Sequence, residues 1–223
     1  MTLTLSNREK RLGPAFLLLQ MLLVPYGAAT LCAMLSIHSN TIANLMAFYA
    51  NAVLAWVFFR ELLVRSWENH RWSRTLGTVT AGFGLYWLLS SAVLALILAV
   101  QPDYSNINDA GVNAMIDESP WLMTIAVVFA APLAEECLFR GWIFTGLSER
   151  SLPLAYAVTA LFFSAAHIVS YVGSYEPATL FLCFLQYLVP SAVLCWTCVR
   201  ADSLMAPLLL HMLINTIALF TTR

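Results

Sequence analysis

The sequence predicts an all-α, polytopic membrane protein, and three observations lead to this prediction. Hydrophobic residues make up 61% of the 223 residues and charged residues only 10%, whereas soluble domains contain roughly 45–50% apolar and about 25% charged residues. The apolar residues gather in seven runs, each close to the roughly 20 residues that a helix needs to cross a bilayer. Helices are expected because they satisfy their own backbone groups in lipid, and the alternation typical of a membrane β-strand is absent.

We expect the transmembrane helices at 14–35, 41–64, 77–100, 121–147, 152–172, 180–199 and 203–220. The first run resembles a signal peptide at its start, but its apolar character continues to Leu35, so we expect an uncleaved first helix. Several connections are short, which favours antiparallel neighbours. Residues 101–120 are polar and contain Pro, Gly, Asn and Asp. We expect them to form the longest loop, between a three-helix part and a four-helix part.

The charged residues predict an orientation in the membrane. Basic residues precede the first predicted helix and recur in every second connection: Arg8, Lys10, Arg11, Arg65, Arg71, Arg74, Arg150 and Arg200. The 101–120 segment instead carries four acidic residues and no Lys or Arg. The positive-inside rule therefore places the N-terminus in the cytoplasm, and the compact chain favours a bacterial inner membrane. With a net charge of −1 and no basic arm, no nucleic-acid partner is expected.

The fourth predicted helix carries ionisable residues inside an apolar run. Each charge near the bilayer centre costs about 2.5–3.5 kcal/mol on insertion scales, so such residues face the bundle interior and have partners. Glu136 and Arg140 are four residues apart, share a helix face and can pair. Glu135 is rotated about 100° away and is free to meet another helix. Pro132 removes a backbone donor just before the glutamates, and an opened turn there would leave a carbonyl for water or substrate.

Two later predicted helices supply partners at a similar depth. His167 follows Phe163 by four residues in the fifth, and His211 and Asn215 share one face of the seventh. At a rise of about 1.5 Å per residue, Glu135 lies roughly 18 Å, His211 roughly 12 Å and His167 roughly 22 Å from the inner end of its helix. All three depths fall in the middle third of the bilayer. We therefore expect these side chains to converge on one polar pocket.

Such a pocket suits the hydrolysis of an amide by an activated water. Glu135 paired with His167 can act as a general base, and His211 and Asn215 can donate hydrogen bonds to an oxyanion. No serine or cysteine has an evident activating base, so no covalent intermediate is expected. A zinc site built from the histidines and a glutamate is an alternative, although no HExxH motif occurs. Each group also has a purely structural interpretation, with His167 as a hydrogen-bonded core residue and Glu136–Arg140 as a structural ion pair.

Three motifs, taken in order, resemble those of a known family. Glu135-Glu136-x-x-x-Arg140, Phe163-x-x-x-His167 and His211-x-x-x-Asn215 are similar to the motifs of the CPBP family, the CAAX prenyl proteases and bacteriocin-processing enzymes, also called the Abi family of glutamic intramembrane proteases. The resemblance covers roughly residues 121–220. We interpret this part as the protease core of a single transmembrane domain spanning residues 1–223.

The resemblance implies an intramembrane endopeptidase that needs neither a cofactor nor a catalytic metal. It implies that Glu135 and His167 activate the water and that His211 and Asn215 form the oxyanion hole. Glu136 and Arg140 would hold the site in shape or assist the base. Family members act on prenylated CAAX tails, peptide leaders or sorting tails, so the expected partners are the lipid bilayer and a membrane-associated protein or peptide substrate.

Two other classes of function remain open at this stage. Intramembrane Glu and His residues also form proton relays in coupled transporters, which are expected to show inverted repeats or broken helices at matching positions; neither is clear here. A non-catalytic membrane scaffold or immunity protein could use the polar cluster for packing alone.

Overall fold

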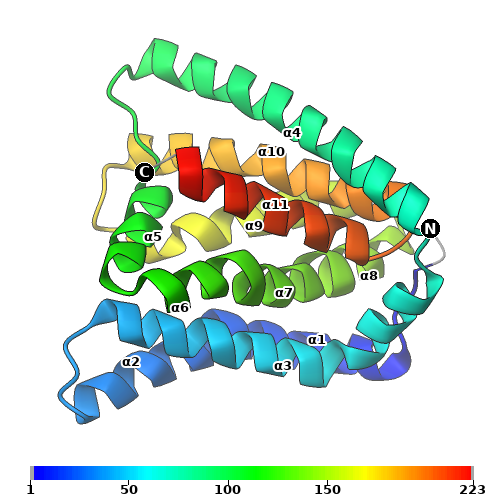
Figure 1. Ribbon diagram of the computed structural model, residues 1–223, viewed down its shortest axis with the longest axis horizontal. Coiled ribbons are helices and arrows are strands. Elements are labelled where there is room, and N and C mark those ends of the chain that lie inside the picture. The colour runs from blue at the N-terminus through cyan, green and yellow to red at the C-terminus, as the bar shows by residue number, and fades with distance from the viewer. Residues whose placement is uncertain (1–2, 222–223) are drawn as a thin grey trace.

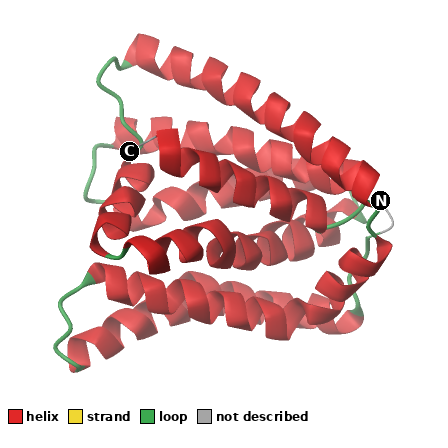
Figure 2. Cartoon of the chain, in the orientation of Figure 1, coloured by secondary structure: helices red, strands yellow, loops and turns green. Residues whose placement is uncertain are grey.

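The computed structural model describes residues 3–221, which form a bundle of helices (Figure 1). Helices, turns and loops account for these residues, and no strand is drawn among them (Figure 2). Six helical segments are long and apolar enough to cross a membrane: Asn7–Met34, Asn40–Asn69, Trp72–Val100, Pro120–Ser148, Leu152–Tyr171 and Pro177–Ala201. The apolar helix Met205–Thr221 is shorter. The predicted all-α, polytopic membrane architecture with about seven spans is confirmed.

Several of these segments are chains of shorter elements. In order they are α1 (Asn7–Leu18), the π-helical turn η1 (Leu19–Leu23), α2 (Val24–Met34), α3 (Asn40–Asn69), α4 (Trp72–Val100), α5 (Ile107–Glu118), α6 (Pro120–Ile125), the π-helical turn η2 (Ala126–Ala130), α7 (Ala131–Glu136), the π-helical segment η3 (Cys137–Phe144), α8 (Thr145–Ser148), α9 (Leu152–Ile168), the 3-10 turn η4 (Val169–Tyr171), α10 (Pro177–Ala201) and α11 (Met205–Thr221). Side chains of Ser6, Ser39, Asn106 and Ser151 accept backbone N–H groups at the starts of α1, α3, α5 and α9. Polar residues before apolar runs thus fix where these helices begin.

The segment that contains both glutamates is the central one. Of its most apolar window, 67% is buried inside the protein, against 6% for α4. Helices α1, α3, α9, α10 and α11 all contact it, and Figure 1 shows α6, α7 and α8 running through the middle of the bundle. Helix α4 lies at the outside against α10 and α11. Its exposed apolar side chains suit contact with lipid, whereas other helices surround the segment that carries the glutamate motif.

The expectation that residues 101–120 form a loop is wrong. Residues 107–118 form the helix α5, which runs across one end of the bundle (Figure 1). Asn106 caps it by accepting hydrogen bonds from the backbone N–H groups of Asn108 and Asp109. Ile107 and Ile116 are buried on its inner side. The polar composition concealed the helix, because its few apolar residues are buried by tertiary contacts.

A proline explains why the carbonyl of Gln20 in η1 needs a partner from another helix. The N–H of Val24 bonds to the carbonyl of Leu19 rather than to Gln20, as in a π-helical turn. The next possible donor is Pro25, which has no N–H. The Nδ2 of Asn51 on α3 lies 3.5 Å from the Gln20 carbonyl oxygen and donates to it.

The same arrangement recurs in η2 of the central segment. The N–H of Ala131 bonds to the carbonyl of Ala126, and the following residue, Pro132, has no N–H. The carbonyl of Val127 is left without a helical donor and accepts a hydrogen bond of 2.9 Å from Nδ2 of Asn215 on α11. The predicted opened turn before the glutamates therefore exists, but its carbonyl is taken by Asn215 rather than left for water or substrate.

We predict that Gly13→Ala destabilises the protein. A Cβ at Gly13 would lie 2.0 Å from Nε1 of Trp142, because α1 packs directly on that indole ring. Overpacking of this kind costs roughly 1–3 kcal/mol, so thermal unfolding in detergent should shift to lower temperature. The matched control is Gly27→Ala in α2, where a Cβ meets nothing within 4 Å and alanine favours the helix by about 0.5–1 kcal/mol. Equal melting temperatures for the two variants would contradict the close packing.

Candidate active site

One oxygen of Glu136 connects two helices at the back of the candidate site. Its Oε1 accepts a hydrogen bond of 2.9 Å from Nη1 of Arg140 and lies 2.7 Å from Nδ1 of His211. The side chains of Glu136 and Arg140 are 1% and 0% exposed. The Nη2 of Arg140 donates to the carbonyl and to the hydroxyl of Ser191 on α10, both at 3.1 Å. The predicted Glu136–Arg140 pair is present, and it fixes α10 and α11 to the central segment.

The contact with Glu136 fixes the state in which His211 can act. The carboxylate of Glu136 already accepts from Arg140, so Nδ1 of His211 must be the donor in their hydrogen bond. In a neutral imidazole the other nitrogen, Nε2, is then without a hydrogen. His211 can donate from Nε2 only when its ring is protonated.

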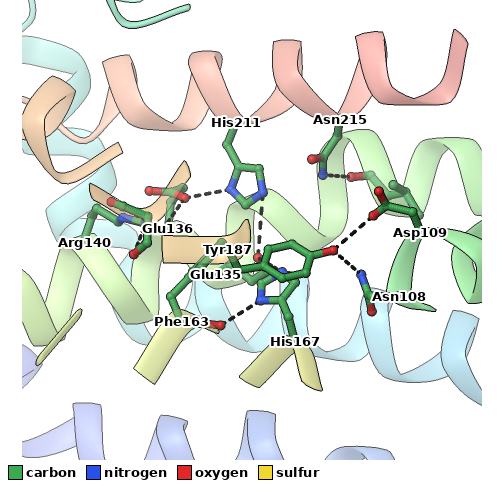
Figure 3. Close-up of polar contacts among 12 residues, drawn as sticks. Asn108, Asp109, Glu135, Glu136, Arg140, Phe163, His167, Tyr187, His211 and Asn215 are labelled. Atoms are coloured by element: carbon green, nitrogen blue, oxygen red, sulfur yellow. Dashed lines mark hydrogen bonds and ion pairs between the residues drawn. The ribbon is translucent and has the colours of Figure 1, made fainter. Parts of the chain in front are cut away.

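Glu135 points away from this ion pair toward two imidazoles. Its Oε2 lies 3.9 Å from Nε2 of His167 and 3.8 Å from Nε2 of His211. These separations are too long for direct hydrogen bonds, and Oε2 makes none to the described residues although it is buried. Figure 3 shows His211 and Asn215 reaching in from α11, with His167 on the opposite side of Glu135. The three side chains face one another from three separate helices.

The ring of His167 is held at both its edge and its face. Its Nδ1 lies 2.8 Å from the carbonyl of Phe163, and because a carbonyl only accepts, Nδ1 carries the hydrogen. The remaining nitrogen, Nε2, faces Glu135 as an acceptor. Tyr187 of α10 stacks on the ring at a centroid distance of 4.2 Å and an interplanar angle of 25°. His167 is therefore presented to Glu135 in one tautomer and one orientation.

Sequence reasoning missed the residues that hold Tyr187. The Tyr187 hydroxyl donates to Oδ1 of Asp109 at 3.0 Å and accepts from Nδ2 of Asn108 at 2.9 Å. Both partners belong to α5, which was expected to be a loop. The polar pair Gln186-Tyr187 inside an apolar run was the available signal. Burial raises the pKa of the Asp109 carboxyl, opposed by the hydrogen bond from Tyr187. The docking of α5 therefore loses stability as the pH rises through that raised pKa.

The site opens on a cavity of about 350 Å³. Four of the six predicted site residues line it: Glu135, His167, His211 and Asn215. Glu136 and Arg140 are not among its lining residues and lie behind them. Within residues 3–221, no three His, Cys, Asp or Glu side chains form a group that could hold a metal ion.

A comparison with protein families identifies this region. The family model described as "Type II CAAX prenyl endopeptidase Rce1-like" matches residues 117–217. That segment contains Glu135, His167 and Asn215, all of α7 and α9, and most of α11.

Residues 117–217 are Rce1-like.

The match agrees with the resemblance to CAAX proteases that the three motifs carry, and it supports an intramembrane CAAX protease-type function for the site. The Rce1-like segment is a little under half of the chain, and it excludes α1 to α4 and all but the last two residues of α5. No curated protein and no solved structure matches the chain.

We predict that Arg140→Leu destabilises the protein strongly. The substitution leaves the buried Glu136 carboxylate without its cation, and breaking a buried pair in this way costs about 3–5 kcal/mol. Ser191→Ala is the matched comparison, because it removes one acceptor from the same guanidinium and leaves the ion pair intact. A lost hydrogen bond to a charged group costs about 1.5–3 kcal/mol. Denaturant unfolding in detergent measures the free energy of unfolding of both variants. An equal loss of stability in the two would argue against the central role of the Glu136–Arg140 pair.

We predict that Tyr187 orders the ring of His167. Tyr187→Leu removes the stacking ring and is expected to shift and broaden the His167 imidazole signals in ¹³C-histidine NMR spectra. Tyr187→Phe keeps the ring but loses the bonds to Asn108 and Asp109, so it should leave those signals nearly unchanged while hydrogen exchange in residues 107–118 becomes faster. Tyr156→Phe, at the other end of the bundle against Phe144, is the control. Unchanged His167 signals in Tyr187→Leu would show that Tyr187 does not order the ring of His167.

Proposed function

We propose that the protein is a glutamic-type intramembrane endopeptidase of the CPBP kind, which hydrolyses a peptide bond in a membrane-associated protein or peptide. The observation that carries this proposal is the position of Glu135. Its unbonded Oε2 faces the Nε2 atoms of His167 and His211 at 3.9 and 3.8 Å beside a cavity of about 350 Å³. The match of the Rce1-like family model supports the same chemistry.

In this proposal Glu135 and His167 hold and deprotonate the attacking water. Glu135 Oε2 and His167 Nε2 are both hydrogen-bond acceptors, so one water can donate a hydrogen to each and turn a lone pair toward a substrate carbonyl. Attack forms the C–O bond while a proton passes to Glu135.

The oxyanion that forms is stabilised by His211 and Asn215. Protonated His211 donates from Nε2, since its Nδ1–H is committed to Glu136. Asn215 uses one N–H of its Nδ2 for the carbonyl of Val127 and has a second N–H for the oxyanion. When the C–N bond breaks, the proton held by Glu135 passes to the leaving nitrogen. Glu136 and Arg140 hold His211 in place, without contacting the substrate.

The proposed setting is a bacterial inner membrane with the N-terminus in the cytoplasm. Three ion pairs gather at the N-terminal end of the bundle: Arg8–Glu61, Lys10–Glu149 and Arg65–Glu9. The acidic α5 lies at the other end (Figure 1). This distribution follows the positive-inside rule.

We predict that Glu135→Gln and His167→Ala each abolish cleavage. Both remove a group that accepts a hydrogen from the water, and loss of a general base lowers the rate by about 10²- to 10⁴-fold. The measurement compares the membrane proteomes of a deletion strain complemented with wild type or with each variant, scoring proteins that keep an uncleaved terminus.

Glu68→Gln is the matched control, because Glu68 is exposed near the end of α3 and away from the cavity. It should restore cleavage to the level of wild type. Wild-type cleavage by Glu135→Gln would refute the proposed function, provided that the variant inserts and unfolds at the same temperature as wild type.

A further inference from the structure

The cavity beside Glu135 is lined by an unusual concentration of carboxamide side chains. Its lining contains 31 of the 223 residues, yet it includes eight of the twelve Asn and Gln residues of the chain. None of the Lys and Arg residues that the structure describes is among them. The proposed chemistry uses only Asn215. The other seven carboxamides need a separate explanation.

On one side of the cavity, Asn51 and Gln20 present acceptors that have no hydrogen-bond partner among residues 3–221. Asn51 is anchored through Nδ2 to the Gln20 carbonyl, which leaves its Oδ1 without a hydrogen bond, as is the Oε1 of the Gln20 side chain. The two residues are only 8% and 7% exposed. A buried acceptor left unsatisfied is strongly unfavourable. Capping an orphan carbonyl explains the anchored end of Asn51 but not the free one.

On the opposite side, Gln186 and Asn108 are also anchored at one end. Gln186 Oε1 accepts from the Tyr104 hydroxyl and from Nδ2 of Asn106, so its Nε2 is left as a donor. Asn108 donates from Nδ2 to Tyr187, so its Oδ1 is left as an acceptor. Each anchor fixes the direction of the free end. Gln20, Asn51, Gln186 and Asn108 thus form an uncharged wall of the cavity. Their free ends point in fixed directions and include both hydrogen-bond donors and acceptors.

An unwound peptide backbone is the ligand that needs such a wall. A helical segment satisfies its own N–H and C=O groups, but a segment extended for cleavage cannot, and in lipid each unsatisfied group is costly. A carboxamide offers one donor group and one acceptor, which matches the alternating groups of an extended chain. No Lys or Arg in the described part of the chain lines the cavity, whereas Glu135 and Asp109 do. The proposed charge on His211 is already paired with Glu136, so a free C-terminal carboxylate would find no unpaired cation there.

We propose that this cavity binds an extended, uncharged peptide segment through its backbone, with Gln20, Asn51, Asn108 and Gln186 as the binding residues, and that it takes internal segments in preference to a free C-terminal end. The proposal rests on the proposed function, because it specifies the substrate of that site.

The test measures binding by Glu135→Gln protein in lipid nanodiscs, so that cleavage does not interfere. The probe is an octapeptide of alternating Ala and Leu with a neutral fluorophore at its N-terminus, prepared as a C-terminal amide, as a free carboxylate and with alternate backbone nitrogens methylated. The amide form is expected to bind, and the other two forms to bind at least about tenfold more weakly, as lost hydrogen bonds and an unpaired charge predict. Equal binding of the methylated and amide forms, or no binding of any form, would overturn the proposal.

Variants of the wall supply an independent measurement. Asn51→Leu is expected to weaken binding of the amide form by about 5- to 10-fold. It should also lower the melting temperature, because the carbonyl of Gln20 loses its donor. A role in packing alone predicts the lower melting temperature with unchanged binding. Asn69→Leu, at the exposed end of the same helix and outside the cavity, is the control and should change neither quantity.

The two proposals fail in different ways. Wild-type protein that cleaves the amide peptide, combined with equal binding of the methylated form, overturns the peptide-binding wall and leaves the peptidase function standing. Selective binding of the amide form by Glu135→Gln, without cleavage of any peptide by wild type, supports the wall and overturns the peptidase function.

Discussion

A charge buried inside a membrane protein must be paired, and the rest of the site depends on how Glu136 meets this requirement. One of its oxygens holds both Arg140 and His211, and Arg140 in turn binds Ser191. The central segment, α10 and α11 are thereby fixed relative to one another. Glu136 is committed to Arg140 and His211, whereas the adjacent Glu135 faces the cavity with no Lys or Arg of the described residues bonded to it. Two neighbouring carboxylates thus differ in role because their helical rotation gives them different partners.

Backbone defects connect the fold to the cavity. Pro25 and Pro132 each follow a π-helical turn, and each leaves one carbonyl that no helical N–H reaches. Asn51 and Asn215 supply the missing donors from other helices. An asparagine anchored in this way has its other end fixed in space. Each of these two residues therefore satisfies an unpaired backbone carbonyl and also presents an oriented polar group to the cavity. An apolar side chain at either position could do neither.

The cavity extends well beyond the Rce1-like segment. Gln20, Asn51, Asn108 and Asp109 belong to η1, α3 and α5, outside the 117–217 match. Helix α5 reaches the site through Tyr187, which lies against His167. The groups proposed for water activation thus come from the matched segment, whereas much of the wall that would meet a substrate comes from the N-terminal half. This division suits a shared chemistry combined with a substrate preference particular to this chain.

The sequence by itself determined the membrane class, the approximate spans and the pairing of Glu136 with Arg140, because length, hydropathy and helical spacing act locally. It also predicted that His167, His211 and Asn215 lie at about the same depth in the membrane as Glu135, because the rise per residue is nearly constant in a helix. It did not reveal α5, the stacking of Tyr187 on His167, the Asn215–Val127 bond or the protonated state that His211 needs to donate. Those features depend on which faces of separate helices meet, and on where one hydrogen is already committed. Only tertiary packing decides both, because the same side chain finds different partners on different neighbours.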